Sequence, residues 1–178
     1  MKNPIYDAAM ELGRATNHGE TSALIADDVW DIVKSHALIA VGAAWVPVPG
    51  ADIALMAGNV WTMYIRINNK YHISFSENAM KSIGSGIISN LASNILALSV
   101  GSLVKFIPGA SVFTGVFLSA LVYATTLTAA WVYLRALTRF YANGGGSESC
   151  LRAYVDDILS DTEAVRDVFN DAKSSYRK

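Results

Sequence analysis

Two long uncharged stretches decide the fold: residues 82–104, which read SIGSGIISNLASNILALSVGSLV, and residues 106–134, which read FIPGASVFTGVFLSALVYATTLTAAWVYL. A helix needs about 20 mostly apolar residues to cross a hydrocarbon layer of about 30 Å, and each stretch is long enough. Pro108 and Gly109 interrupt the helical pattern between them, next to the charge of Lys105. The sequence therefore predicts an all-α protein whose main hairpin, residues 82–134, is embedded in a lipid bilayer.

A second, shorter hairpin is predicted at residues 37–65. Its uncharged stretches, 37–51 and 53–65, are too short to span a membrane unaided and are typical of core helices or re-entrant hairpins. Both hairpins turn at Pro-Gly-Ala sequences, which indicates either a duplicated unit or two common turns. Asp52 either caps the following helix or stands as a charge at membrane depth. The predicted tips are Pro47, Pro49, Gly50 and Asp52 in the shorter hairpin, and Pro108 and Gly109 in the main one.

Composition also favours a membrane protein. The chain is 52% hydrophobic and 16% charged, whereas an ordinary soluble domain has about 25% charged residues. A soluble helical bundle is the alternative, because the first long stretch is rich in serine and asparagine. The net charge is −1 and no basic cluster exists, which excludes a nucleic-acid-binding surface.

Small side chains recur every four residues along both long stretches and form a continuous face on each helix. Helices in lipid associate through such small-residue faces, because close backbone approach and hydrogen bonds replace the hydrophobic force. We therefore predict a helix-packing face that also supports a homo-oligomer. In the rival interpretation, these positions line the water of a channel together with Thr125, Thr126 and Thr128. The predicted face consists of Ser85, Ser89, Ser93, Ala97, Gly101, Ser111, Gly115 and Ser119.

Polar segments flank the uncharged region at both ends. Residues 1–36 and 148–178 have the periodicity of amphipathic helices, and they enclose a membrane-embedded domain at 37–142 and a Gly-rich linker at 143–147. Asn3 and Pro4 are a typical helix start. Two capping boxes are predicted, one from Ser74 to Glu77 and one from Ser160 to Glu163.

The distribution of basic residues predicts the orientation in the membrane. Five basic residues lie on the side of the termini, against Lys105 alone at the main tip. Because basic residues are enriched in cytoplasmic loops, both termini should be cytoplasmic in a multi-pass protein of a bacterial inner membrane. The five residues are Arg66, Lys70, Lys81, Arg135 and Arg139.

No catalytic, cofactor-binding or metal-binding constellation is found, and the protein is predicted not to be an enzyme. His36 lies on an apolar face, where a hydrogen-bonded structural histidine is favoured over a ligand or proton relay. Asp27, Asp28 and Asp31 are interpreted as a solvated acidic face rather than a cation site. Cys150 is predicted to be a small buried side chain on a helix, and a single cysteine excludes a disulfide framework.

The Pro-Val-Pro-Gly-Ala-Asp tip at 47–52 and the Leu-Val-Lys-Phe-Ile-Pro-Gly tip at 103–109, with Gly115 and Tyr123-Ala124-Thr125, carry a resemblance. They resemble the GTPase-associated, YcjF-like membrane-domain family of unknown function (the domain of unknown function 697 type) over about residues 35–142. That family is found attached to Era-like and dynamin-like GTPases, so the resemblance implies a membrane location and a GTPase partner. This chain lacks the phosphate-binding Gly-x-x-x-x-Gly-Lys-Ser/Thr sequence.

The sequence thus predicts a non-enzymatic integral membrane protein that self-associates and serves as a membrane scaffold or adaptor. Its expected partners are the lipid bilayer, further copies of itself, and a GTPase or a membrane-remodelling protein. A channel and a soluble helical interaction module remain as alternatives.

Overall fold

The computed structural model describes the backbone of residues 3–43, 51–99 and 111–176, and the side chains of residues 3–42, 55–93 and 117–176. Within these ranges the chain is helical and contains no β-strand, which confirms the all-α prediction. The elements are α1 (Pro4–Ala15), the 3-10 turn η1 (Gly19–Thr21), α2 (Ser22–Ala43), α3 (Ala51–Lys70), α4 (Glu77–Ser99), α5 (Ser111–Ala142), α6 (Glu148–Ser160) and α7 (Thr162–Ser175).

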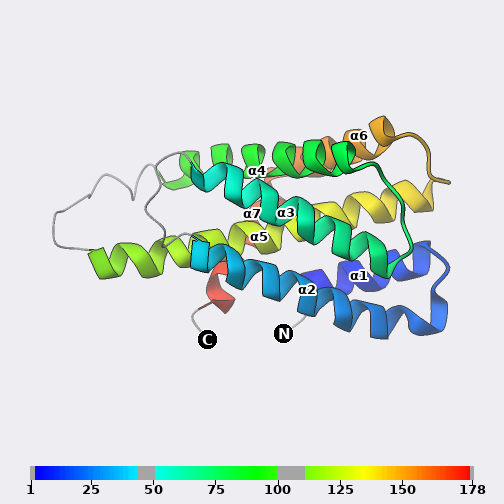
Figure 1. Ribbon diagram of the computed structural model, residues 1–178, viewed down its shortest axis with the longest axis horizontal. Helices are drawn as coiled ribbons and strands as arrows, with labels where there is room; N and C mark the ends of the chain where they lie inside the picture. Colours follow the sequence, from blue (N-terminus) through cyan, green and yellow to red (C-terminus); the bar gives the residue numbers. More distant parts are fainter. Residues whose placement is uncertain (1–2, 44–50, 100–110, 177–178) are drawn as a thin grey trace.

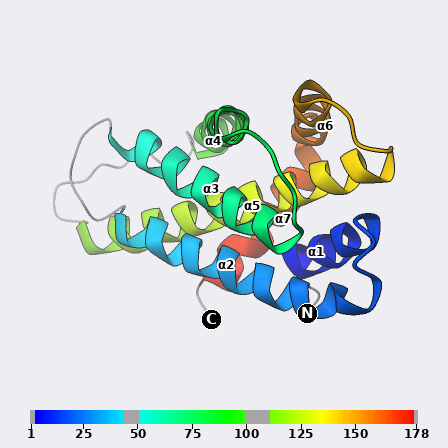
Figure 2. The ribbon, with the colours of Figure 1, turned by 45° about the vertical axis from the view of Figure 1, so that its right-hand side comes forward.

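Helix α5 is the central helix of the bundle. Figures 1 and 2 show it surrounded by other helices, and α1, α2, α6 and α7 all pack directly on it. The reason lies in its composition, because alanines let neighbouring helices approach closely while larger apolar residues fill the space between them. Its fully buried residues include Ala124, Ala129, Ala130, Val132, Leu134 and Leu137. The terminal amphipathic helices therefore contribute to the same hydrophobic core as the uncharged ones.

A polar cluster inside the core joins α3, α4 and α5. The Tyr133 hydroxyl donates to Asn68 Oδ1 at 2.7 Å, and the Asn68 amide contacts the sulfur of Met80 at 3.3 Å. The Tyr64 hydroxyl donates to the carbonyl oxygen of Ala129 at 3.0 Å, and its ring stacks on Tyr133 with centroids 3.9 Å apart. All four side chains are buried. Hydrogen bonding is what makes such burial tolerable, because an unpaired polar group in a core is destabilising.

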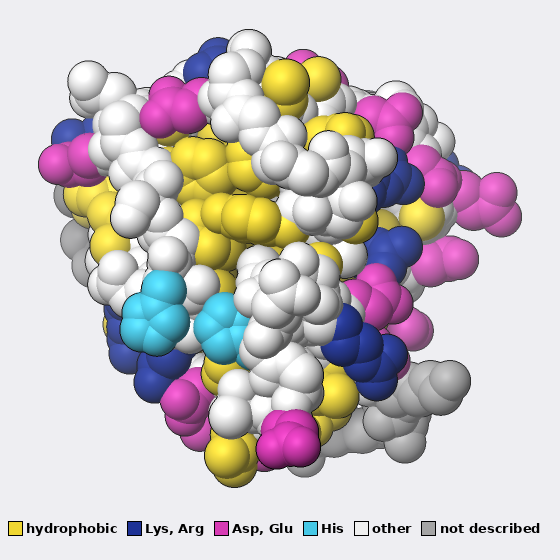
Figure 3. Space-filling model, turned by 90° about the vertical axis from the view of Figure 1, so that its right-hand side faces the viewer, with side chains coloured by type: hydrophobic (Ala, Val, Ile, Leu, Met, Phe, Trp, Pro, Cys, Tyr) yellow, Lys and Arg dark blue, Asp and Glu magenta, His cyan; other side chains and the backbone are white. Residues whose placement is uncertain are grey.

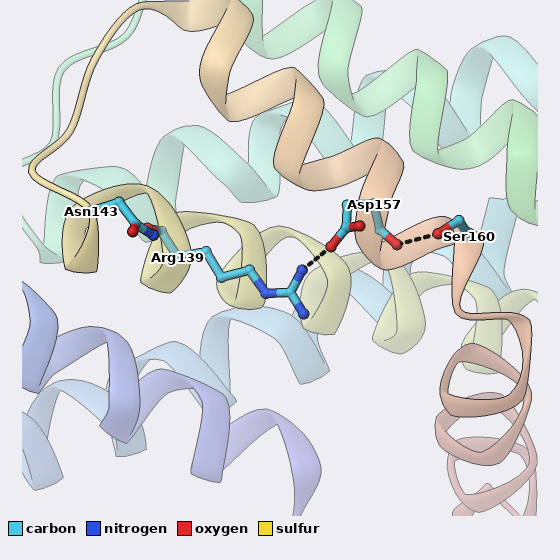
Figure 4. Close-up of polar contacts among 4 residues, drawn as sticks. All are labelled: Arg139, Asn143, Asp157 and Ser160. Carbon is cyan, nitrogen blue, oxygen red and sulfur yellow. Dashed lines mark hydrogen bonds and ion pairs between the residues drawn. The ribbon is translucent and has the colours of Figure 1, made fainter.

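The helices run so that the molecule has two different ends. The last turns of α2 and α4 and the first turns of α3 and α5 lie together at the left of Figure 1. Both predicted hairpins, α2 with α3 and α4 with α5, therefore turn at the same end. Figure 3 shows the opposite end, where charged side chains surround a central area of hydrophobic ones. Arg139 near the end of α5 forms an ion pair with Asp157 in the last turn of α6 (Figure 4).

One of the three predicted helix starts is confirmed, and the two predicted capping boxes are not. Asn3 Oδ1 accepts from the amides of Ile5 and Tyr6, as predicted. The hydroxyl of Ser76 caps α4, but the acceptor for the Ser76 amide is Glu148 of α6 and not Glu77. The predicted Ser74–Glu77 box is therefore wrong, because α4 is capped by Ser76 and Glu77 is its first residue, so Glu77 does not lie three residues after the cap.

At the second predicted box, α7 starts one residue later than expected. Asp161 Oδ1 accepts from the amide of Ala164, whereas the Ser160 hydroxyl donates back to the carbonyl of Asp157 at the end of α6. Cys150 is a further correction. Its thiol is exposed in the first turn of α6 and is not a buried hydrophobic group.

Candidate functional site

The end of the bundle where both hairpins turn carries exposed apolar side chains and no charge on most of its helical surface. Leu38 and Ile39 of α2, Leu55 of α3 and Leu118 of α5 are between 43% and 57% exposed. Each lies within a few turns of the helix end that belongs to this part of the molecule. Single exposed leucines are common on soluble proteins, but a group of them on uncharged segments marks an interaction surface. We call this part of the molecule the uncharged end.

One helix in the described part of the chain is long and apolar enough to cross a membrane. This segment is Phe117–Ala142 in α5, and 78% of its most apolar window is buried inside the bundle. A core helix of a bundle has the same properties, so this segment alone does not establish a crossing. The predicted main hairpin at 82–134 is accordingly not confirmed as a pair of spans, although α4 and α5 do exist as helices.

Helix α7 limits how α5 can meet lipid. Lys173 places its ammonium group 5.0 Å from the ring centroid of Phe117, and Tyr176 packs against Tyr123 at 5.2 Å. A charged helix thus lies along one side of α5 as far as its second turn. The lysine marks a natural limit of insertion, because long basic side chains extend toward water from an apolar surface.

The predicted small-residue face lies partly on the outside of the bundle. Ser85, Ser89 and Ser93 are exposed on α4, and the Ser93 hydroxyl donates to the carbonyl of Ser89 at 2.8 Å. They do not mediate the contact between α4 and α5 within one chain. Ser119 of α5 is instead buried. The face therefore remains a prediction for contact between chains.

Several predicted residues fall outside the described side chains. Ala97, Ser111 and Gly115 belong to helices whose side chains are not described there, as does the hairpin-tip residue Asp52. Gly101 and the remaining tip residues, Pro47, Pro49, Gly50, Pro108 and Gly109, lie outside the described backbone.

The threonines invoked for a channel are buried in the core. The hydroxyls of Thr125, Thr126 and Thr128 donate to carbonyls four residues earlier in α5, at 2.8 to 3.0 Å. Their hydrogen-bonding capacity is satisfied within the helix, so they do not need a water-filled pore. Within the described residues, no group of three potential metal ligands occurs.

A buried histidine links α2 and α3 at the boundary between the charged and uncharged segments. His36 Nδ1 lies 2.8 Å from Asn59 Oδ1, and Asn59 returns a bond of 2.9 Å from its amide to the His36 carbonyl. Arg66 donates to His36 Nε2 at 3.1 Å. Since Arg66 can only donate, His36 is neutral and carries its proton on Nδ1. Burial of the ring, and to a lesser degree the positive charge of Arg66, lower the pKa of His36, while the hydrogen bonds with Asn59 act in the opposite direction.

The sequence predicted the structural role of His36 but did not identify its partners. Asn59 is the signal that could have done so, because it carries an amide in the uncharged stretch 53–65 and lies two helical turns before Arg66. Asp28 and Asp31 are exposed, as expected for a solvated face, and Asp28 pairs with Lys70 at 2.6 Å.

Comparison with known proteins gives one informative similarity. Over 134 residues the chain is 33% identical to Magnetosome membrane protein 22 of Magnetospirillum gryphiswaldense. The aligned region covers 70% of this chain and 65% of that protein, so the chain corresponds to somewhat under two thirds of its relative. No family model and no solved structure matches, which leaves the resemblance to the YcjF-like family a prediction. This chain is thus similar to a protein named for a membrane.

Proposed function

We propose that this protein is a membrane-associated scaffold that inserts the uncharged end of its bundle into a lipid bilayer and self-associates through the exposed face of α4. The observation that carries the proposal is the group of exposed leucine and isoleucine side chains at that end. Four of them, from three different helices, face outward where the helices lack charge. The relative named for the magnetosome membrane supports a membrane location independently.

Insertion of the uncharged end would remove apolar side-chain area from water. Moving a fully exposed Leu or Ile side chain into an apolar environment contributes about 1.5–3 kcal/mol. Leu38, Ile39, Leu55 and Leu118 are each about half exposed, so each contributes a part of this amount. Their sum favours insertion, and it must outweigh the desolvation of Asp52, in the first turn of α3, and of Lys105, which lies between the two long uncharged stretches.

The lengths of the helices favour insertion from one side. The uncharged stretch of α3, from residue 53 to residue 65, is about 18 Å long at 1.5 Å per residue, which is less than the hydrocarbon thickness. Lys173 beside Phe117 sets a shorter limit on α5, because residues 111–117 extend over only about 10 Å at the same rise per residue. The end of the bundle therefore enters one side of the bilayer, while α1, α6 and α7 stay in water and can bind partners. A GTPase among those partners is the expectation that the family resemblance supplies.

The experiment compares two substitutions on the same helix. Ile39→Glu places a charge on the uncharged end, whereas Leu24→Glu places it at the opposite end of α2, where Leu24 is 70% exposed. Both variants add the same charge at an exposed position of one helix. We expect Ile39→Glu to reduce flotation of the protein with lipid vesicles, and Leu24→Glu to leave flotation unchanged. Equal flotation of both variants would contradict insertion of the uncharged end.

A second measurement separates insertion from surface adsorption. Inserted protein should stay with the vesicles after a carbonate or high-salt wash and should need detergent for release. Release without detergent would favour the soluble interaction module.

A further inference from the structure

A polar groove opens between α2 and α3 just outside the uncharged segments. It has a volume of about 380 Å³ and is lined by Asp28, Asp31, Ile32, Ser35, Arg66, Asn69 and Lys70. This volume is many times the roughly 30 Å³ that a water molecule occupies in the liquid, so the groove is wide enough for a polar group of several heavy atoms. The protein groups that line it are charged or hydrogen-bonding except for Ile32.

The charges in the groove are not all used within the protein. Lys70 and Asp28 neutralise each other at 2.6 Å. Arg66 and Asp31 make no ion pair within the described residues, and one is a cation while the other is an anion. Arg66 has an orientation imposed by the protein, because its guanidinium donates to the neutral, buried ring of His36 at 3.1 Å. The groove thus presents one oriented cation and one carboxylate.

The place of the groove in the molecule suggests the source of its ligand. Arg66 directly follows the uncharged stretch 53–65, and Asp31 lies less than two helical turns before the uncharged stretch that begins at residue 37. If the uncharged end enters lipid, as in the proposed function on which this inference rests, the groove lies at the level of the lipid headgroups. Headgroups there carry a phosphate and, in ethanolamine lipids, an ammonium group with three N–H donors.

We propose that the groove between α2 and α3 binds the phosphate–ammonium headgroup of an ethanolamine phospholipid. Arg66 binds the phosphate, since a guanidinium donates two parallel hydrogen bonds to phosphate oxygens. Asp31 accepts from the ammonium group, and the side chain of Asn69 offers additional hydrogen bonds. A choline headgroup satisfies only the first contact, because its quaternary nitrogen carries no N–H. The site therefore distinguishes ethanolamine from choline lipids.

Vesicle binding tests the proposal. The probes are vesicles of phosphatidylcholine alone and vesicles of equal parts phosphatidylcholine and phosphatidylethanolamine, with the full-length protein titrated against each. We expect tighter binding to the ethanolamine vesicles. Arg66→Gln should weaken binding to both vesicle types several-fold, because the headgroup phosphate loses its charged bidentate hydrogen-bond donor. Asp31→Asn should keep binding to phosphatidylcholine and lose the preference for ethanolamine.

Matched controls remove the effect of net charge. Arg152→Gln and Asp156→Asn make the same charge changes at exposed positions of α6, away from the groove, where neither residue makes an ion pair. Both should bind like the unmodified protein. Circular dichroism of each variant confirms that the helices are retained. Equal losses for the groove and control variants would overturn the proposal.

Soluble competitors identify the chemistry. Phosphoethanolamine should compete with ethanolamine vesicles better than inorganic phosphate does. Equal competition by the two would overturn the role of Asp31 and leave a simple phosphate site. If the protein binds both vesicle types equally and Asp31→Asn has no effect, this inference fails while the proposed function stands. If it binds no vesicle of either type, the proposed function fails as well.

Discussion

Tyr133 is the residue at which the polar contacts of the core meet. Its hydroxyl donates to Asn68 and also contacts the sulfur of Met80 at 3.1 Å, and its ring stacks on Tyr64. The hydroxyl thus fixes the positions of α3 and α4 relative to the central helix. A phenylalanine would fill the same space without this function.

We expect Tyr133→Phe to lower the free energy of unfolding by about 1–3 kcal/mol, because the buried oxygen of Asn68 loses its hydrogen-bond donor. Denaturant titration in detergent, followed by circular dichroism, measures the change. Tyr154→Phe is the control, since Tyr154 is only partly buried and its hydroxyl has no hydrogen-bond partner among the described residues. A Tyr133→Phe variant as stable as the control would show that the cluster is dispensable.

His36 should make stability depend on pH. The pKa of His36 in the folded protein lies below the ordinary value of about 6.5, chiefly because the ring is buried. When the pH lies between the lowered pKa of the folded state and the ordinary pKa of the unfolded state, His36 of the unfolded chain binds a proton that the folded chain does not. The free energy of unfolding should therefore fall as the pH drops through this window and be fully restored above it.

The test is a denaturant titration at pH values above and below about 6.5. His36→Gln should flatten the pH dependence in the window. His72→Asn should retain it, because His72 is exposed and asparagine tolerates its positive φ of 53°. The same slope in the protein and in His36→Gln would rule out His36 as the titrating group.

At the scale of the element, α4 has an outer face that is small and uncharged from Ser82 to Ser93, beyond the Glu77–Lys81 ion pair of its first turns. Its inner face is closed by Ile83, Ile87, Ile88 and Leu91, all buried, while a Cβ added at Gly86 on the outer face meets no atom within 4 Å. Such an asymmetric helix is suited to contact a second copy, because small residues allow backbones to approach.

We expect Ser93→Leu to disrupt the proposed self-association, because the larger side chain would separate the helices and remove contacts that contribute about 0.6–2 kcal/mol each in membranes. Crosslinking in native membranes measures the outcome. Ser174→Leu is a matched control, since Ser93 and Ser174 are both exposed helical serines whose hydroxyls donate to the carbonyl four residues earlier at 2.8 Å. An unchanged crosslinking pattern for Ser93→Leu would remove self-association through α4.

At the scale of the whole molecule, the question is whether the main hairpin crosses the bilayer. Basic residues predict cytoplasmic termini and a tip at Lys105 on the far side. The position of α7 along α5 favours a tip that enters from one side and does not emerge. The two arrangements differ in whether the tip meets water.

Thiol labelling with an impermeant reagent separates them. Cys150 is exposed, and a hydrogen bond with Ser147 lowers the pKa of its thiol, so it should react from the side on which the water-exposed helices lie. A cysteine at Lys105, in a Cys150→Ser background, should react from neither side of reconstituted vesicles. Reaction from the side opposite Cys150 would instead demonstrate a crossing hairpin.

The sequence by itself determined the secondary structure and the division into charged and uncharged segments. Proline, glycine and capping signals act over a few residues, so the start of α1 at Pro4 and the end of α5 before Gly144 could be predicted. The periodicity of residues 148–178 likewise indicated amphipathic helices, and α6 and α7 bury apolar residues that include Leu151 and Phe169. Uncharged length could be read directly, because it depends only on composition.

Only the tertiary structure decided what the uncharged helices contact. A long apolar helix satisfies lipid and a protein core equally well, so its hydropathy could not show that most of the Phe117–Ala142 segment of α5 is covered by other helices. The Ser76 amide at the start of α4 donates to Glu148 of α6, and Arg66 of α3 donates to His36 of α2. Both contacts join residues that are far apart in the chain. Such contacts depend on how the helices pack in space, so they cannot be predicted from the residues next to them in the sequence. The same packing left the serines of α4 and the groove between α2 and α3 facing outward.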